Sequence, residues 1–337
     1  MSIWNGKYGP LLIAEIGGNH EGNFEYAQKL TQLACESGVD AVKFQIYTGD
    51  SLVNKHVDPD RNKHFKKFEL TPNQYIELAK HCNDNNVLFS ASVWDPSAFE
   101  WIDEYIPFYK IGSGDLTAFP IIDKIVSYGK PILLSTGLST MDEVQETVEF
   151  IQSQDQEYLN PDSLCLLQCT SMYPIPPEDA NLKVMEEFRK KFNVSVGYSD
   201  HTIGTTAVET SFVLGAQVIE FHFTDDRQGK SFRDHQISFT KEEVIQLIEK
   251  IKLIKSLLGD GIKKPLESEI ESGHITSFRR GLYFSRDHKK GEKIQPNSIV
   301  SLRPQNGLSA KFYSDIIGKV LSKDVFKLEK VIWDCFE

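Results

Sequence analysis

Short apolar segments alternate with amphipathic segments between residues 11 and 258. Eight of the apolar segments are rich in β-branched residues and have the length of buried strands. They span residues 11–16, 41–45, 87–92, 109–111, 132–135, 163–168, 195–198 and 218–223. The segments between them include residues 26–35, 71–82, 140–151 and 204–214, whose apolar residues recur at helical spacing, and residues 241–258 follow the last strand in the same way.

Eight strand-then-helix units within about 250 residues are typical of a closed (β/α)8 barrel, the TIM barrel. A doubly wound open sheet is the alternative α/β fold, but such sheets usually have fewer strands. We therefore predict a barrel domain for residues 1–260.

The pattern changes after residue 258. Gly259, Asp260 and Gly261 end the helical periodicity, and residues 265–277 are polar with few apolar positions, which is typical of a linker. The remainder consists of short strands and turns, in which SRDHKKGEKI at residues 285–294 recurs as SKDVFKLEKV at residues 322–331. We predict a linker at 261–278 and a small, duplicated β-rich domain at 279–337, which needs a partner surface for stability because it buries little surface itself.

The composition is that of an ordinary globular protein, with 40% hydrophobic and 25% charged residues in a chain of 337. No apolar run approaches the ~20 residues that span a bilayer, and residues 1–7 do not resemble a signal peptide. We therefore expect a cytoplasmic protein outside the membrane. The five cysteines form no CxxC pair, so we expect reduced, mostly buried thiols.

The formal charge of −11 has the wrong sign for binding to nucleic acid or to an anionic membrane surface. Any anionic ligand must therefore be held by a local cluster of basic groups. In a (β/α)8 barrel such a site lies at the C-terminal ends of the strands. All eight predicted strands end in polar residues, among them Glu15, Lys43, Gln45, Ser92, Lys110, Asp115, Ser135, Ser171, Tyr173, Ser199, His201, Glu220 and His222.

Lys43 and Lys110 lie within apolar strands, where an inward-facing lysine loses its hydration and needs an anion. Together with Ser92, Ser113 and Ser135 they predict a site for a phosphate or carboxylate group. The alternative is that each lysine faces the surrounding helices and extends to solvent.

His201 and His222 end consecutive strands, so both imidazoles are expected on one side of the barrel mouth. Two neutral imidazoles with nearby carboxylates suit a divalent ion such as Mn2+, Zn2+, Co2+ or Mg2+. We expect Glu15, Asp115 and Asp234 nearby. The alternative is that each histidine is a hydrogen-bonded structural residue. For Cys165 and Cys169, core packing is the expected role.

Several motifs together resemble the N-acetylneuraminate (sialic acid) synthase family over nearly the whole chain. They are IAEIGGNH at residues 13–20, VKFQ at 42–45, YKIGSG at 109–114, LSTG at 134–137, YSDHT at 198–202 and RPQNGL at 303–308. The last motif lies in a segment similar to the antifreeze-like (SAF) domain of these enzymes. The resemblance implies a TIM barrel followed by an SAF domain, in a homodimer whose C-terminal domain covers the partner's active site.

The resemblance also implies an activity, the condensation of phosphoenolpyruvate with a 2-acetamido sugar aldehyde to give a nine-carbon 2-keto acid and phosphate. It implies phosphoenolpyruvate binding by Lys43, Ser92, Lys110, Ser113, Ser135, Ser171 and Ser199. It implies that His201 and His222 hold Mn2+ or Mg2+, with Co2+ as another possibility, and that Glu15 or Asp115 deprotonates a water. The sugar would contact Glu15, Gln45, Tyr173 and Asp234, and Arg303 of the partner subunit.

The chain departs from the family pattern at four places. Phe221 replaces a cation, Asp115 replaces a glutamate, Ser171 replaces an asparagine, and residues 231–235 replace a Gly-Pro-Asp segment. These departures leave the identity of the sugar open among N-acetylneuraminate, legionaminate, pseudaminate and related products. Two other function classes compete with the synthase: a metal-dependent sugar isomerase or hydrolase, and a non-catalytic carbohydrate-binding protein.

Overall fold

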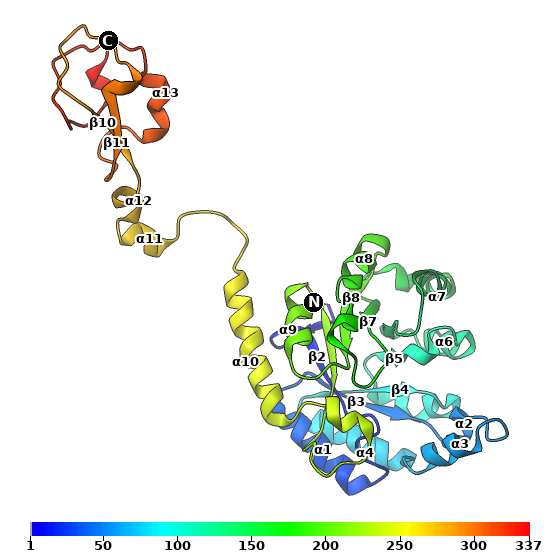
Figure 1. Cartoon of the computed structure of the whole chain (residues 1–337). Helices are drawn as coiled ribbons and strands as arrows, with labels where there is room; N and C mark the ends of the chain where they lie inside the picture. Colours follow the sequence, from blue (N-terminus) through cyan, green and yellow to red (C-terminus); the bar gives the residue numbers. More distant parts are fainter. Residues whose placement is uncertain (1) are drawn as a thin grey trace. The chain divides into compact units, whose positions relative to one another are not determined.

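Eight parallel strands form a closed barrel in the computed structural model, which describes residues 2–337 (Figure 1). In barrel order they are β2 (Gly9–Glu15), β3 (Ala41–Ile46), β4 (Leu88–Val93), β5 (Tyr109–Ile111), β6 (Ile132–Ser135), β7 (Leu164–Gln168), β8 (Ser195–Asp200) and β9 (Val218–His222). Strand β9 pairs with β2 in parallel, with Glu15 opposite His222, and this pairing closes the sheet. The predicted barrel is confirmed, and the open doubly wound sheet is excluded.

Helices follow the strands and cover the outside of the barrel. They are α1 (Phe24–Ser37), α4 (Pro72–Asp84), α5 (Phe99–Ile102), α6 (Phe119–Val126), α7 (Met141–Gln154), α8 (Val184–Lys191), α9 (Thr206–Val213) and α10 (Lys241–Leu258). Two short helices, α2 (Gly49–Leu52) and α3 (Pro59–Lys66), lie in the connection between β3 and α4. Thr71 and Thr140 begin α4 and α7 with capping boxes, which satisfy backbone N–H groups that the helix itself leaves free.

The inner face of the barrel changes from apolar to polar along the strands. Ile13, Ala41, Phe108, Leu133 and Val218 form an inner apolar cluster together with Trp4, which precedes the short strand β1 (Asn5–Gly6). Side chains two residues apart on a strand share a face. The next inward positions toward the C-terminal ends are therefore Glu15, Lys43, Lys110, Ser135 and Glu220.

A second unit, Gly259–Glu337, has its own core. It contains α11 (Glu267–Glu271), α12 (His274–Ser277), β10 (Gly281–Phe284), β11 (Ile299–Leu302), which pairs with β10 in antiparallel orientation, and α13 (Tyr313–Ile316). The segment expected to be an irregular linker is thus partly helical. The rings of His274 and Phe278 stack in this part of the chain, with centroids 4.3 Å apart.

The two copies of the internal repeat pair with each other in a reciprocal manner. The backbone N–H of Lys290 donates to Asp324 Oδ1 at 2.9 Å, and the N–H of Lys327 donates to Asp287 Oδ1 at 2.7 Å. His288 and Val325 exchange both of their backbone hydrogen bonds. The aspartate at the equivalent position of each copy therefore binds the turn of the other copy. The predicted duplicated β module is confirmed.

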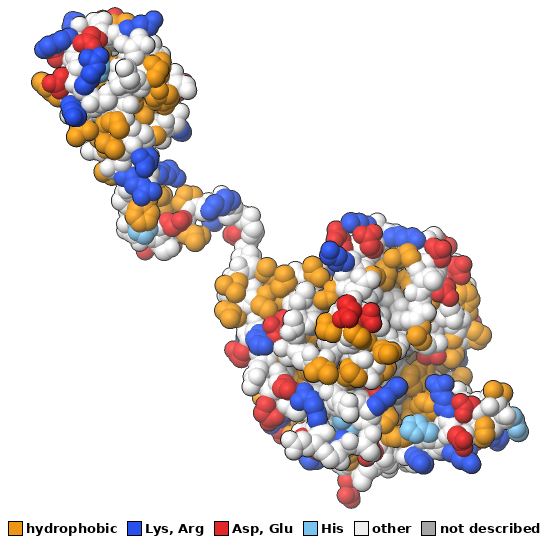
Figure 2. Space-filling view, viewed as in Figure 1, with side chains coloured by type: hydrophobic (Ala, Val, Ile, Leu, Met, Phe, Trp, Pro, Cys, Tyr) orange, Lys and Arg blue, Asp and Glu red, His pale blue; other side chains and the backbone are white. Residues whose placement is uncertain are grey.

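Acidic and basic side chains are interspersed over the face shown in Figure 2. The formal charge of −11 therefore does not form one continuous acidic surface on this face. Among residues 2–337, no helix has the length and apolar character needed to cross a membrane.

Candidate active site

A chain of buried ion pairs lies at the C-terminal mouth of the barrel. The Nζ atom of Lys43 is 2.7 Å from Glu15 Oε2 and 3.9 Å from Glu220 Oε2, and the Nζ atom of Lys110 is 2.7 Å from Glu220 Oε1. All four side chains are buried. The lysines therefore face the interior of the barrel, where two carboxylates balance their charges, and do not extend outward between the helices.

Neutral groups also donate to these carboxylates, although Glu220 Oε2 has no hydrogen-bond partner in the described chain. Gln45 Nε2 donates to Glu15 Oε1 at 2.8 Å, and Ser199 Oγ donates to Glu220 Oε1 at 3.0 Å. Strand register explains two contacts of the network, because Glu15 lies opposite Lys43 in the pairing of β2 with β3, and Ser199 lies opposite Glu220 in the pairing of β8 with β9.

The two glutamates differ in acidity. Burial raises the pKa of Glu15, and the Lys43 ammonium opposes that rise only in part. Burial acts on Glu220 as well, but Lys110 and Lys43 outweigh it and lower the pKa of Glu220 to about 2. Glu220 is therefore a permanent counter-charge, whereas Glu15 is the carboxylate suited to gain and lose a proton.

Three of the five predicted serines, Ser92, Ser135 and Ser199, lie on barrel strands. Ser92 lies opposite Lys110 in the register of β4 and β5, and both are buried. Ser135 is buried, and its Oγ atom has no hydrogen-bond partner within residues 2–337. A buried hydroxyl without a partner is costly, so this position is suited to a polar ligand.

Ser113 and Ser171 converge on Gly137. The Gly137 N–H donates to Ser113 Oγ at 3.0 Å. A Cβ atom at Gly137 would lie 2.5 Å from Ser171 Oγ and 2.8 Å from Ser113 Oγ, so only glycine allows both hydroxyls to approach. The serine that departs from the family pattern, Ser171, therefore lies beside a predicted anion-binding residue.

The two histidines are adjacent, with ring centroids 5.3 Å apart. The Nδ1 atom of His201 is 2.7 Å from the Thr170 carbonyl, which fixes the ring and leaves Nε2 free. The Tyr173 ring lies against both, 4.1 Å from His201 and 5.7 Å from His222 between centroids.

His222 has the properties of a neutral ligand. It is buried, and its Nδ1 atom has no hydrogen-bond partner in the described chain, although Asp234 Oδ2 is 3.8 Å away. Burial, helped by the charges of His201 and Lys43, lowers the pKa of His222 well below its usual range. Within residues 2–337 no three His, Cys, Asp or Glu side chains group as a metal site. The two imidazoles could hold a divalent ion only if substrate or water supplied its other ligands.

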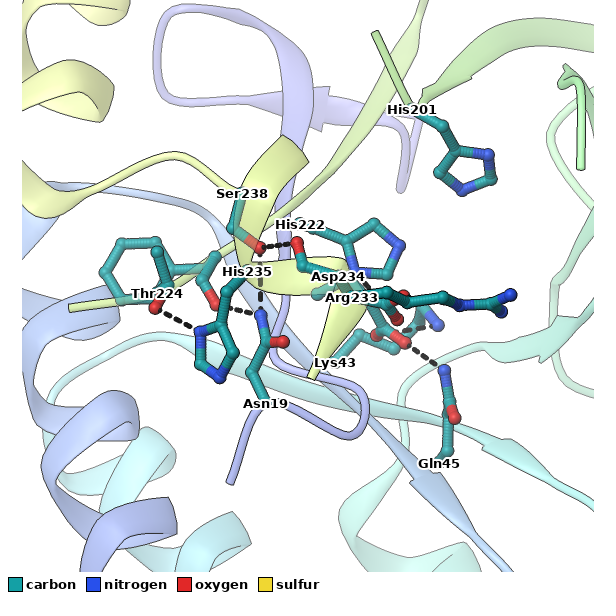
Figure 3. Close-up of polar contacts among 12 residues, drawn as sticks. Asn19, Lys43, Gln45, His201, His222, Thr224, Arg233, Asp234, His235 and Ser238 are labelled. Atoms are coloured by element: carbon teal, nitrogen blue, oxygen red, sulfur yellow. Dashed lines mark hydrogen bonds and ion pairs between the residues drawn. The ribbon is translucent and has the colours of Figure 1, made fainter. Parts of the chain in front are cut away.

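The loop that carries Asp234 is held from both sides (Figure 3). Asn19 Nδ2 donates to Ser238 Oγ at 2.9 Å, and Ser238 Oγ donates to the Asp234 carbonyl at 2.7 Å. Thr224 Oγ1 and His235 Nδ1 are 2.7 Å apart. These contacts fix Asp234 beside His222.

Of the remaining predicted residues, Asp115 is in the barrel unit and Arg303 is in the second unit. Asp115 is half-buried beside Trp94, and within residues 2–337 no hydrogen bond or ion pair joins it to either histidine. Burial raises the pKa of Asp115, and the neighbouring Trp94 opposes the rise. Arg303 belongs to the second unit, where it is exposed and lies 5.7 Å from the centre of the Phe278 ring.

Two other expectations have clear outcomes. Cys165 is in the inner apolar core, as predicted. Cys169 is also buried, as expected for a packed residue, and its Sγ atom is 3.9 Å from His201 Nδ1. The departure at Phe221 does not touch the site, since that ring stacks on Phe239 with centroids 4.9 Å apart.

Sequence reasoning missed the roles of Glu220, Asn19 and Arg233. Glu220 is two residues before His222 on one strand, and this spacing alone indicates that both point into the barrel. No comparable signal exists for Asn19 or Arg233, because their contacts join segments that are distant in sequence.

A closed barrel with ion-paired lysines and glutamates and two adjacent histidines at its mouth defines the class of a (β/α)8-barrel enzyme. The NeuB family model matches residues 30–263, and the SAF domain model matches residues 279–337. The chain therefore belongs to the NeuB family.

Named relatives cover most of the chain. It is 34% identical to the N,N'-diacetyllegionaminic acid synthase of Campylobacter jejuni, covering 96% of this chain and 98% of that one. It is 34% identical to the N-acetylneuraminate-9-phosphate synthase of Mus musculus, covering 79% and 76%. The crystal structure of an N-acetylneuraminic acid synthetase from Leptospira borgpetersenii in complex with citrate matches with a TM-score of 0.71 at 27% identity, covering 78% of this chain and 90% of that one.

Proposed function

We propose that this enzyme is a nonulosonic acid synthase, which condenses phosphoenolpyruvate with a 2-acetamido or 2,4-diacetamido hexose such as N-acetylmannosamine. The products are a nine-carbon 2-keto acid and phosphate. The observation that carries the proposal is the pair of buried ion pairs, Lys43–Glu15 and Lys110–Glu220, with the unpartnered Ser135 hydroxyl, at the mouth of a NeuB-family barrel. The named relatives give no support to a sugar isomerase, a hydrolase or a non-catalytic binding protein.

Phosphoenolpyruvate enters the lysine cluster. Its phosphate and carboxylate groups are held by Lys43, Lys110 and the hydroxyls of Ser92, Ser113, Ser135, Ser171 and Ser199. The unpartnered Ser135 hydroxyl supports this role, because it would gain a hydrogen bond from the ligand. The added negative charge increases the proton affinity of the Glu15 carboxylate, whose pKa is already raised by burial, so that Glu15 is a better proton acceptor than Glu220.

The reaction forms one carbon–carbon bond and breaks one carbon–oxygen bond. Carbon three of phosphoenolpyruvate attacks the aldehyde carbon, whose oxygen takes a proton and becomes a hydroxyl. Water adds to carbon two and gives one proton to Glu15, which balances the proton taken up by the aldehyde oxygen. The carbon–oxygen bond to phosphate then breaks, and phosphate carries away the second proton of that water to leave the 2-keto group. Glu15 suits this base role better than Asp115 because it contacts the lysine cluster directly.

His201 and His222 are the ligands for Mn2+ or Mg2+, with Co2+ as a further candidate. Such an ion supplies a Lewis acid for the sugar aldehyde when bound. Gln45, Tyr173 and Asp234 contact the sugar beside this pair. Their positions support this role. Gln45 donates to Glu15, the Tyr173 ring lies against both imidazoles, and Asp234 is next to His222.

The active form is a homodimer in which the C-terminal domain covers the partner's barrel and contributes Arg303 to the sugar site. Large apolar side chains on three consecutive loops support a covering surface there. Leu138 follows β6 and is 78% exposed, Met172 follows β7 and is 61% exposed, and Ile203 follows β8 and is 72% exposed. The cytoplasmic location stays a prediction.

A phosphate-release assay tests the proposal. The protein is incubated with phosphoenolpyruvate, Mn2+ and a panel of 2-acetamido and 2,4-diacetamido hexoses, and release is expected with at least one sugar and none after EDTA. Phosphoenolpyruvate with oxygen-18 in the bridging position should transfer the label to phosphate. Absence of turnover with every sugar would contradict the proposed function, and activity that survives EDTA would contradict the metal.

A further inference from the structure

Arg233 lies at the outer edge of the site and is the cation that the proposed reaction does not use. Its Nε atom donates to Asp234 Oδ1 at 3.1 Å, and its guanidinium is 4.5 Å from the centre of the Tyr173 ring. Figure 3 shows the side chain extending from the loop past Asp234. The side chain is 68% exposed, and its terminal nitrogens have no hydrogen-bond partner within residues 2–337.

The two lysines deeper in the barrel already form ion pairs with glutamates. Lys43 and Lys110 are buried and are paired with Glu15 and Glu220. Arg233 uses one of its five N–H donors on Asp234, so the planar edge with the terminal nitrogens is free to bind a carboxylate or phosphate in bidentate geometry. Stacking on Tyr173 holds the guanidinium in place and lowers the entropy cost of such binding.

A second, independent feature adds positive charge beside the Arg233 loop. The Phe232 ring lies against Phe68 with centroids 4.9 Å apart, which joins this loop to the segment that follows α3. The last turn of α3 carries Lys63, His64 and Lys66, and Lys67 follows. Lys66 is paired with Asp50, whereas Lys63 and Lys67 are exposed without an ion-pair partner in the described chain.

We propose that Arg233 determines specificity by binding an anionic group, a phosphate or a carboxylate, at the end of the sugar remote from its aldehyde. The inference rests on the proposed function. In that reaction the aldehyde lies beside His201 and His222, so the far end of the sugar extends outward over Tyr173 and Asp234 to Arg233. The substrate class is therefore an acetamido sugar that carries a phosphate or carboxylate.

The test compares N-acetylmannosamine, its 6-phosphate and the corresponding 2-acetamido hexuronate at saturating phosphoenolpyruvate. The wild-type enzyme should have a kcat/KM at least about 10-fold higher for one or both anionic sugars than for N-acetylmannosamine. The sugar with the higher value shows whether the anionic group is a phosphate or a carboxylate. Arg233→Gln should lower kcat/KM for that sugar by about 10- to 100-fold, in line with loss of a charge-assisted hydrogen-bonded pair. It should change the value for the neutral sugar by less than about threefold and leave the KM for phosphoenolpyruvate unchanged.

Arg227→Gln is the matched control, because Arg227 lies in the same connection between β9 and α10 but is paired with Glu243. It should leave all three sugars unchanged. A wild-type preference for the neutral sugar overturns the inference and leaves the proposed function intact. The inference is also overturned, and the proposed function left intact, if Arg233→Gln changes only the KM for phosphoenolpyruvate. Failure of every sugar to release phosphate rejects the proposed function as well.

Discussion

Two buried glutamates in one network carry different chemistry because their surroundings differ. Glu220 is hydrogen-bonded to Lys110 and Ser199 and lies 3.9 Å from Lys43, whereas Glu15 pairs with Lys43 and accepts a hydrogen bond from Gln45. The pKa of Glu220 is about 2, and that of Glu15 is raised by burial. This difference in pKa makes Glu220 the fixed charge and Glu15 the residue suited to proton transfer.

Glu15→Gln should lower kcat by about 10²- to 10⁴-fold, the usual loss when a general base is removed. Because the pKa of Glu15 is raised, its active carboxylate form accumulates as the pH rises above the ordinary range of a glutamate, and kcat/KM of the wild type should rise with it. The measurement is kcat/KM against pH. The acid limb should be flattened in Glu15→Gln and retained in Asp115→Asn, and the reverse result would make Asp115 the base.

Glu220→Gln should destabilise the ligand-free protein by about 3 kcal/mol, because Lys110 loses its buried counter-charge. Since the folded-state pKa is lowered to about 2, the stabilisation by Glu220 is complete above its unfolded-state pKa of about 4.3 and is lost as the pH falls toward 2. Denaturant unfolding between pH 7 and pH 3 measures both effects. Phosphoenolpyruvate should stabilise the variant more than the wild type.

The exposed Glu242→Gln serves as the comparison for Glu220→Gln, with an expected change within about 0.5 kcal/mol. Equal unfolding free energies for the wild type and Glu220→Gln would show that the lysines find other partners.

His222→Ala should abolish metal-dependent turnover and weaken Mn2+ binding, because it removes one of two proposed ligands. Mn2+ binding followed by electron paramagnetic resonance checks the loss without relying on activity. His56→Ala, which changes an exposed histidine, should bind Mn2+ like the wild type. Unaltered Mn2+ binding by His222→Ala would exclude this imidazole as a ligand.

At the scale of elements, the barrel strands could be predicted because each is an uninterrupted apolar segment between polar loops. Strand β5 (Tyr109–Ile111) and strand β6 (Ile132–Ser135) have the predicted bounds. The partners of the site residues could not be predicted in the same way. The Lys43–Glu15 pair depends on the register between β2 and β3, and Arg233 reaches Tyr173 only through tertiary contacts.

Comparison of the two copies of the repeat identifies backbone strain in the second copy. Gly291 has a φ of 85°, and Leu328, at the corresponding place in the second copy, has a φ of 65°. Positive φ is easily adopted by glycine and costs an L-residue about 1–2 kcal/mol. Leu328 is 55% exposed, so it buries little surface in return.

Leu328→Gly should therefore stabilise the second unit by up to about 1 kcal/mol, after the larger backbone entropy of glycine in the unfolded chain is subtracted. Hydrogen exchange of residues 279–337 in the full chain measures the effect locally. Gly291→Ala should have the opposite sign, since it places a Cβ atom at positive φ. Destabilisation by Leu328→Gly would show that the leucine side chain contributes packing that outweighs the strain.

At the scale of the whole molecule, the chain consists of two units with separate cores, and the proposed site draws residues from both. His222 is in the barrel unit and Arg303 is in the second unit. If Arg303 acts in the partner's site, then each active site of the dimer combines His222 of one chain with Arg303 of the other.

Mixed dimers of His222→Ala and Arg303→Ala test this arrangement. In a mixed dimer, the barrel of the Arg303→Ala chain is intact and receives Arg303 from the His222→Ala chain, so one of its two sites is complete. Random mixing makes half of the dimers mixed, and about a quarter of the wild-type activity should therefore return when the two variants are unfolded and refolded together. Each variant refolded alone should have little activity. If Arg303 served the barrel of its own chain, every site would carry a defect, and refolding the mixture would restore nothing.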